Sequence, residues 1–283
     1  MSDKKRVFIT GASAGFGFDT VKALAARGHT VFAAMRDVSG RNAAKATELE
    51  SWATANHHAV HVVEVDVTND ASVAKGIATA VDRGGLDVII NNAGAGTWGI
   101  DEGFSIDQAR QIFELNLLGV MRVNRAAVPH FRENGKGLIL YVSSGLGRIV
   151  FPFMAIYTAS KFALEGYAES TSYELAPLGI QSVIIQPGAY GTTFLANCVQ
   201  PKTDVVGTYG ATAKMFGAFS SGFEARAKSG GLGDPSEVVT AMVEEVERPA
   251  GDRPLRRPVG RDVGEAVTAI NQTCNQIQDG LLS

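Results

Sequence analysis

The sequence is poor in cysteine. Its 283 residues include two cysteines, Cys198 and Cys274. Their positions give neither the ligand spacing of a zinc site nor the disulfide framework that stabilises small secreted domains. We therefore expect both to be free thiols, and we expect no metal site.

Long apolar runs and dense blocks of positive charge are also missing. No stretch approaches the ~18 apolar residues that a membrane-spanning helix needs, and no charged-then-apolar leader is seen. The net charge is −3, and we interpret the one group of arginines, Arg253, Arg256 and Arg257, as a solvated loop. These features predict a cytoplasmic protein without a membrane span and disfavour nucleic acid as a partner.

What the sequence does contain is a regular alternation of short apolar runs and helical patterns. The apolar runs lie at residues 6–10, 30–35, 59–65, 86–90, 137–142, 180–186 and 255–259, and the longest helical pattern between them covers about 105–133. This alternation is typical of an α/β fold with one doubly wound parallel sheet, a Rossmann fold of about seven strands with helices on both faces. We expect a single domain over residues 1–283, with its ligand crevice at the carboxyl ends of the strands.

Two segments depart from the alternation. Residues 189–234 are rich in small and aromatic residues and are too long for a passive connection, so we predict a mobile substrate lid there. Residues 262–283 have weakly amphipathic helical spacing and are predicted to form a C-terminal helical tail.

The first apolar run leads directly into a glycine-rich turn and then into a helical pattern. Gly11, Gly15 and Gly17 lie in this turn. Glycines allow the backbone to approach a pyrophosphate, and a helix N-terminus offers it unpaired N–H groups and a positive dipole end. The strand, turn and helix therefore predict a dinucleotide site.

A second motif places three polar groups where they could act on one substrate atom. Tyr157 and Lys161 are four residues apart in a helical pattern and share one face, while Ser144 follows an apolar strand. A nearby ammonium favours phenolate, so Lys161 is expected to lower the pKa of Tyr157, and Ser144 could donate a hydrogen bond to a carbonyl oxygen. Together they indicate interconversion of a carbonyl and an alcohol, although a Tyr–Lys pair by itself is also consistent with surface decoration.

Taken in order, the motifs resemble the compact type of the short-chain dehydrogenase/reductase family over about residues 5–260. The stretch YTASKFALEGYAES is further similar to the hydroxysteroid and retinol dehydrogenase branch. The motifs that carry the resemblance are Thr10-Gly11-x-x-x-Gly15-x-Gly17, Asn91-Asn92-Ala93-Gly94, Asn116, Ser144, Tyr157-x-x-x-Lys161 and Pro187-Gly188.

The resemblance implies four catalytic residues. Tyr157 would be the general acid/base and Ser144 would hold the substrate oxygen. Lys161 would bind the nicotinamide ribose and tune the tyrosine, and Asn116 would assist a water relay to Lys161. Without the resemblance, an asparagine amid apolar helix formers would instead be expected to bond locally and bend the helix.

The resemblance also implies an NADP(H) site. Asp66 would contact adenine, Asn91 would steady the central strand, and Thr192 would bond the nicotinamide carboxamide; a helix cap, a turn residue and a helix start are the respective alternatives. The complete predicted cofactor set is Gly11, Ser13, Gly15, Phe16, Gly17, Arg36, Asp66, Val67, Asn91, Ala93, Gly94, Tyr157, Lys161, Pro187, Gly188 and Thr192.

Arg36, at the end of the run 30–35, bears on the choice between the two nicotinamide cofactors. Arginine attracts a 2′-phosphate, whereas an acidic residue would bond the ribose 2′-hydroxyl and repel the phosphate. By resemblance, Met35 occupies the position where NAD-preferring relatives carry aspartate. We predict NADPH, with an NAD-preferring dehydrogenase as the alternative because Asp37 is adjacent and Ala14 replaces a basic residue of some NADP-dependent relatives.

The predicted function is therefore an NADPH-dependent carbonyl reductase, reversible as an alcohol dehydrogenase. A nucleotide-sugar epimerase or dehydratase shares the Tyr-x-x-x-Lys pair, but the C-terminal part is short for a sugar-nucleotide domain. The resemblance also implies a homodimer or homotetramer. An apolar ketone, aldehyde or secondary alcohol is the expected substrate, with walls formed by Trp98, Phe151, Phe153, Met154, Tyr190, Phe194, Met215, Phe216 and Phe219.

Overall fold

A seven-stranded parallel sheet forms the centre of the molecule in the computed structural model, which describes residues 3–282. The strand order is β3-β2-β1-β4-β5-β6-β7, and every neighbouring pair is parallel. The order reverses between β1 and β4, which is the topological switch point of a doubly wound sheet. The predicted fold class is confirmed; residues 1, 2 and 283 of the predicted domain lie outside the described residues.

The elements follow one another largely as the apolar and helical patterns predict. The strands are β1 Arg6–Thr10, β2 Thr30–Met35, β3 Val60–Glu64, β4 Val88–Asn91, β5 Gly137–Val142, β6 Ile180–Pro187 and β7 Arg256–Val259. The α-helices are α1 Gly15–Ala26, α2 Ala43–Ala55, α3 Asp70–Asp82, α4 Ile106–Phe113, α5 Gly119–Asn134, α6 Ala155–Leu175, α7 Ala211–Lys228, α8 Pro235–Glu247 and α9 Arg261–Leu282. The short helices are η1 Asp101–Gly103, η2 Glu114–Leu118, η3 Gly145–Gly147, η4 Ala176–Leu178 and η5 Val206–Thr208.

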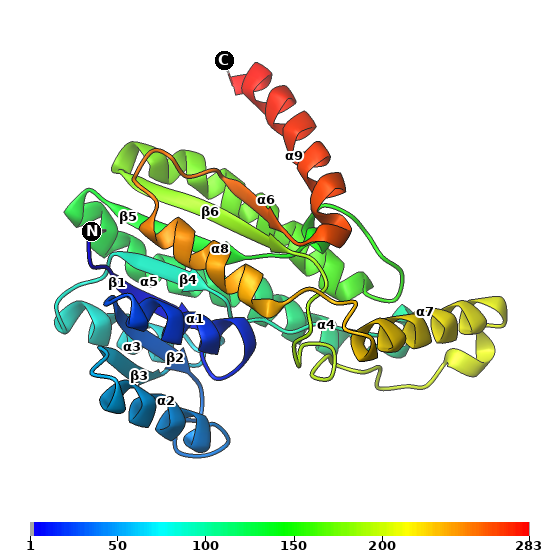
Figure 1. The fold of residues 1–283 in the computed structure, drawn as a ribbon. Helices are drawn as coiled ribbons and strands as arrows, with labels where there is room; N and C mark the ends of the chain where they lie inside the picture. The colour runs from blue at the N-terminus through cyan, green and yellow to red at the C-terminus, as the bar shows by residue number, and fades with distance from the viewer. Residues whose placement is uncertain (1–2, 283) are drawn as a thin grey trace.

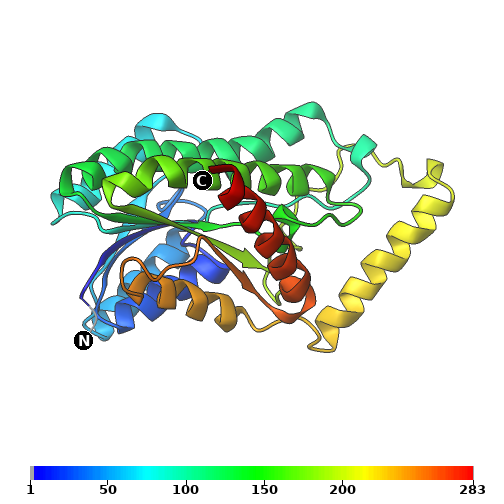
Figure 2. The same cartoon turned by 90° about the horizontal axis from the view of Figure 1, so that it is seen from above.

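Helices cover both faces of the sheet (Figures 1 and 2). One core cluster joins the sheet to α1, α2 and α8, and the other joins it to α3, α5 and α6. Ile90 and Leu140 belong to the first cluster, whereas their chain neighbours Ile89 and Ile139 belong to the second. Because successive side chains point to opposite faces and both faces are covered, the central strands are apolar along their whole length.

The helical region expected at residues 105–133 consists of three segments. Ser105 and Gln108 form a capping box at the start of α4. The backbone then widens into the π-helical turn η2 before α5 continues. A π turn of this kind holds one extra residue and is frequent at functional sites. This one contains Asn116.

The three arginines near the C-terminus are paired, so the prediction of a solvated loop is wrong. Arg256 lies in β7 with a 2% exposed side chain and pairs with Glu165 at 2.9 Å and Glu169 at 2.7 Å. Arg257 pairs with carboxylates of α8, and Arg253 donates hydrogen bonds to backbone carbonyls. The error arose because the partner carboxylates lie on α6 and α8 and meet β7 only through the fold.

Two helices extend beyond the sheet and its covering layers. In Figure 1, α7 (yellow) lies beyond the carboxyl edge of the sheet, and α9 (red) projects away from the body. The two helices occupy the segments in which the sequence pattern lapses. Both cysteines are free, Cys198 buried and Cys274 exposed. Among residues 3–282, no helix combines the length and the apolar character that crossing a membrane requires.

His29, which precedes β2, is fully buried at the opposite edge of the sheet. Its Nδ1 accepts a hydrogen bond from the Lys5 N–H at 3.0 Å, and its Nε2 lies 3.3 Å from a carboxylate oxygen of Glu247. Burial lowers the pKa of this imidazole, and the opposing effect of Glu247 does not fully offset it. As the pH falls, the unfolded chain therefore takes up a proton before the folded protein does.

We expect the free energy of unfolding to decrease as the pH is lowered from about 7.5 to about 5, because a histidine titrates near pH ~6.5 in the unfolded chain. The decrease should be smaller in His29→Gln, whose side chain does not titrate. Urea unfolding of both proteins at the two pH values measures the difference, with the exposed His57→Asn as a control. Identical pH dependence of the wild type and His29→Gln would refute the assignment.

Candidate active site

A cavity of about 1220 Å³ lies at the carboxyl edge of the sheet, at the switch point. The ends of β2, β4, β5 and β6, the turn after β1 and the segment that follows β6 all contribute to its lining. Ligands of open α/β sheets bind at this position because the loops that leave adjacent strands diverge there. The sheet topology therefore brings together motifs that are far apart in the sequence.

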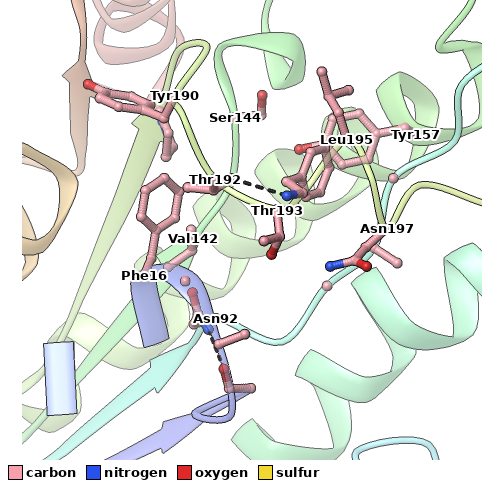
Figure 3. A pocket seen from close by; sticks show the side chains of 18 of the residues that line it. Phe16, Asn92, Val142, Ser144, Tyr157, Tyr190, Thr192, Thr193, Leu195 and Asn197 are labelled. Carbon is pink, nitrogen blue, oxygen red and sulfur yellow. Dashed lines mark hydrogen bonds between the residues drawn. The ribbon is translucent and has the colours of Figure 1, made fainter. Parts of the chain in front are cut away.

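Ser144, Tyr157 and Lys161 meet in this cavity. All three are buried, and Figure 3 shows the side chains of Ser144 and Tyr157 on the same side of the pocket. Tyr157 and Lys161 lie in the first two turns of α6, and the Lys161 Nζ is 5.7 Å from the centre of the Tyr157 ring. Lys161 donates a hydrogen bond to the Val142 carbonyl at 2.9 Å, which fixes the ammonium beneath the end of β5.

Burial controls the protonation of this pair. Removal from water raises the pKa of Tyr157, and a hydrogen bond with Ser144 lowers it only in part. Burial also lowers the pKa of Lys161 to about 8, against the opposing effect of the Glu165 carboxylate. The expectation of a lowered Tyr157 pKa is therefore wrong, because desolvation outweighs the hydrogen bond with Ser144. Tyr157 is a neutral phenol and can donate a proton.

Asn116 is held close to Lys161 by the π-helical turn η2. Its Oδ1 accepts a hydrogen bond from the Ala95 N–H at 3.0 Å, and its Nδ2 donates to the Ala95 carbonyl and to Ser160 Oγ, both at 2.9 Å. A Cβ built on Gly94 would lie 3.2 Å from Asn116 Oδ1 and 3.8 Å from Lys161 Nζ. The side chain fastens the loop after β4 to α6, and it does not line the cavity. The relay role stays a prediction.

The turn after β1 has the shape that a phosphate group requires. Gly11 and Gly15 have φ angles of +68° and +53°, which residues with a Cβ rarely adopt. A Cβ on Gly11 would lie 2.8 Å from Ala93 Cα, whereas one on Gly15 would meet no atom within 4 Å. No side chain caps α1, because Ala14 is at its N-cap position. The first turn of α1 thus offers its N–H groups to an anion.

Most of the predicted cofactor residues line the cavity, but two do not. Gly17 packs against the Gly11 carbonyl and the Asn92 amide. Asn91 is buried in β4, where its amide donates to Asn124 Oδ1 at 2.9 Å. The predicted residues that line the cavity are Gly11, Ser13, Gly15, Phe16, Arg36, Asp66, Val67, Ala93, Gly94, Tyr157, Lys161, Pro187, Gly188 and Thr192.

Asn92 belongs to the strand-end motif but is not among the predicted site residues. It lines the cavity (Figure 3), and its Nδ2 donates to the carbonyls of Thr10 at 3.0 Å and Gly11 at 3.2 Å. The Thr10 hydroxyl in turn accepts from the N–H groups of Asn92 and Ala93, each at 3.0 Å. These bonds join the glycine turn to the end of β4. Successive side chains of a strand point to opposite faces, so Asn91 and Asn92 cannot both face the cavity. This alternation was the sequence signal that could have identified Asn92 as the lining residue.

The part of the cavity formed by α7 and by the segments that follow β4, β5 and β6 is largely apolar. Phe194 lies against Tyr157 with 5.3 Å between ring centres. Phe153 and Phe216, which were also expected to form the wall, pack on one another at 4.9 Å and do not line the cavity, and neither does Met215. The apolar lining residues are the predicted Trp98, Phe151, Met154, Tyr190, Phe194 and Phe219, together with Leu146, Leu195 and Phe223.

Comparison with known proteins identifies the class of enzyme that this fold and site define. Residues 5–203 match the family model described as short chain dehydrogenase. The chain therefore belongs to the short-chain dehydrogenase/reductase family, whose members are NAD(P)-dependent oxidoreductases.

Three relatives show how far the sequence similarity extends. The uncharacterized oxidoreductase YusZ of Bacillus subtilis is 31% identical over 92% of this chain and 91% of its own length. The 3-ketodihydrosphingosine reductase of Bacteroides thetaiotaomicron is 35% identical over 68% of this chain and 66% of its own length. Human retinol dehydrogenase 8 is 33% identical over 67% of this chain and 60% of its own length.

Two solved structures resemble the chain over its whole length. A short-chain dehydrogenase from Streptomyces avermitilis has a TM-score of 0.76 and 28% identity, with 99% of this chain and 96% of that chain covered. A short chain dehydrogenase from Burkholderia cenocepacia, determined in complex with NADP, has a TM-score of 0.71 and 25% identity, with both chains covered completely at 100%.

Replacing Tyr157 with phenylalanine removes the proton donor and keeps the ring that packs against Phe194. We expect kcat for carbonyl reduction to fall by at least ~10²-fold, the usual loss for a general acid, while cofactor affinity stays within about twofold. Steady-state kinetics and cofactor fluorescence titration measure the two quantities. Turnover close to that of the wild type would remove Tyr157 from the catalytic role.

Proposed function

We propose that this protein is an NADPH-dependent carbonyl reductase that also runs in reverse as an alcohol dehydrogenase. The observation that supports this most directly is the neutral phenol of Tyr157 beside Ser144, in a cavity that also contains the glycine turn. When bound, NADPH supplies a hydride to the carbonyl carbon. The protein must then bind the carbonyl oxygen and provide one proton to it.

Three side chains account for that part of the reaction. Ser144 donates a hydrogen bond to the substrate oxygen and orients the carbonyl. Tyr157 donates its phenolic proton to the same oxygen, which completes the alcohol. The Lys161 ammonium stabilises the tyrosinate that is left behind, because an opposite charge nearby favours the ionised phenol. In the direction of oxidation, the same proton returns from the alcohol to Tyr157.

The end of the cavity next to β2, where we expect the adenosine of the cofactor to bind, supports a preference for NADPH. Arg36 and Arg41 both line the cavity there. The Asp37 carboxylate, which the sequence alone left as an argument for NAD, accepts a hydrogen bond from the Arg41 N–H at 2.8 Å and closes its own turn. Asp37 is not part of the lining. Although Asp66 also lines the cavity and interacts with Arg36, two guanidinium groups at this end favour a 2′-phosphate.

Arg36→Ala and Arg41→Ala should each raise KM for NADPH by about 5- to 50-fold, because each removes one charge-assisted contact to the 2′-phosphate. KM for NADH should change by less than about twofold. Cofactor oxidation followed spectrophotometrically, with a fixed ketone, gives both constants, and Arg83→Ala on the far side of the sheet is the control. A wild-type enzyme that uses NADH as efficiently as NADPH would overturn the preference.

The proposed substrate is an apolar carbonyl compound, and the aromatic lining of the cavity supports this choice. Phe219 and Phe223 of α7 face Trp98, with ring centres 5.9 Å and 6.3 Å apart. Such a lining binds by burying apolar surface at roughly 25 cal/mol per Å² and leaves orientation to a few polar groups. Two of the relatives are named for retinol and for 3-ketodihydrosphingosine, both of which carry long hydrocarbon chains.

Only part of the segment 189–234 is free to act as a lid. Val199 forms a β-bridge with Thr97, and the Thr203 N–H donates to the Gly103 carbonyl at 3.0 Å. These bonds fasten the first part of the segment to the loop after β4. The helix α7 has no buried residue, and Gly210 and Gly230 at its ends have φ angles of +51° and +70°. We infer that α7 is the part that moves.

Phe219→Ala should lower kcat/KM for long-chain or aromatic ketones by about tenfold and should leave small ketones nearly unaffected, because it removes apolar lining from one wall. Met215→Ala on the same helix is the matched control, since Met215 is 49% exposed and does not line the cavity. A ketone series of rising chain length provides the measurement. Equal losses in both variants, or no dependence on chain length, would contradict an apolar substrate.

The proposed assembly follows from the family resemblance, and the proposed location follows from the composition and charge of the sequence. We propose a homodimer or homotetramer in the cytoplasm. Phe162 and Tyr173 on the outer face of α6 are 43% and 44% exposed, which supports a partner on this helix.

A further inference from the structure

The helix α6 carries a buried row of ionisable side chains that continues past the site. Tyr157, Lys161, Glu165 and Glu169 follow one another at intervals of four residues, so they lie on one face of the helix. The reaction described above uses the first two. Glu165 is 1% exposed and has no part in that reaction, although burial of a carboxylate is unfavourable unless it is paired.

Glu165 is held in place from several sides. Its Oε2 accepts a hydrogen bond from Arg256 Nε of β7, and its Oε1 accepts one from Gln186 Nε2 of β6, both at 2.9 Å. A Cβ on Gly147 would lie 2.8 Å from Glu165 Cγ, so the loop that carries Ser144 closes directly over this side chain. Asn271 of α9 extends the network by donating to Gln186 Oε1 at 2.8 Å.

Arg256 of β7 links the two carboxylates of this row. Arg256 also pairs with Glu169 at 2.7 Å. One guanidinium therefore faces two carboxylates, and the Arg148 guanidinium also acts on Glu169, whose side chain is 21% exposed. Lys161 lies one turn from Glu165 on the same face of α6, and both residues are buried. Side chains at this spacing are neighbours on a helix.

The other groups packed around Lys161 are not acidic. Tyr157 on α6 is neutral, Asn116 from η2 carries no charge, and β5 contributes the Val142 carbonyl. Glu165 is thus the acidic group that acts on Lys161.

We propose that Glu165 is a positioning residue for catalysis, whose carboxylate keeps Lys161 in its charged form. Arg256 and Gln186 fix the carboxylate, and Glu165 itself touches neither substrate nor cofactor. The proposal rests on the proposed role of Lys161 as the cation that stabilises the tyrosinate. Because burial places the pKa of Lys161 at about 8, loss of the carboxylate should convert Lys161 to the neutral amine within the working pH range.

The test compares Glu165→Gln with Glu169→Gln. Each variant removes one carboxylate from Arg256 and leaves an amide that can still accept its hydrogen bond. In the protein without cofactor, NMR of ¹³C-labelled lysine side chains gives the titration midpoint of Lys161, with Lys161→Arg assigning the signal. Glu165→Gln should lower this midpoint by about one to three pH units, the usual effect of a nearby opposite charge, and Glu169→Gln should shift it much less.

Turnover with NADPH and a ketone should likewise be affected more in Glu165→Gln than in Glu169→Gln. In Glu165→Gln, kcat should fall about tenfold or more near pH 8 and recover toward the wild-type value near pH 6, whereas Glu169→Gln should keep the wild-type profile within about twofold. If Glu165→Gln does not fold, the double variant Glu165→Gln/Arg256→Met replaces it, because removing both members of a buried ion pair is far less destabilising than removing one.

The outcomes separate this inference from the proposed function. An unchanged Lys161 midpoint in Glu165→Gln, or equal shifts in the two single variants, overturns the positioning role. A wild-type protein that reduces no carbonyl compound would overturn the proposed function, while the midpoints measured without cofactor would still decide whether Glu165 sets the charge of Lys161.

Discussion

Burial of the Tyr157–Lys161 pair is the constraint on which the rest of the site depends. Out of water the phenol keeps its proton and the ammonium loses its proton more easily than in solution. A neutral phenol suits proton donation, but the lysine needs help to stay charged. The Val142 carbonyl at the end of β5 and the Glu165 carboxylate on α6 supply that help. In the proposed mechanism, the catalytic chemistry therefore relies on a polar row that runs from the cavity through α6 to β7.

The parallel sheet explains how one cavity comes to have two different ends. All strands deliver their following loops to the same edge, so the glycine turn after β1 and the arginines after β2 lie on one side of the switch point. The loops after β4 and β5, together with α7, contribute aromatic side chains on the other side. Tyr157 stands between the two ends. The arrangement suits a charged, extended cofactor that meets an apolar carbonyl compound at the phenol.

Features that depend on local patterns could be predicted from the sequence. The central strands are apolar throughout because both of their faces are covered, and the glycine turn follows β1 directly. Long-range pairings could not be predicted. Arg256 appeared to be a loop residue because its partner Glu165 is distant in the chain, and the pKa direction of Tyr157 depends on burial that no motif encodes. The attachment of Val199 to Thr97, which limits the proposed lid to α7, likewise exists only in the folded chain.

The central claim is that this protein transfers a hydride from a nicotinamide cofactor to a carbonyl carbon. Incubation with NADPH that carries deuterium at the transferable position of nicotinamide C4, and with a long-chain ketone, tests this directly by mass spectrometry of the product. A deuterium atom on the carbinol carbon, absent from the product of a Tyr157→Phe reaction run for the same time, is the predicted result. An alcohol that forms without the label, or an altered substrate that forms without net consumption of NADPH, as an epimerase or a dehydratase would give, would contradict the account.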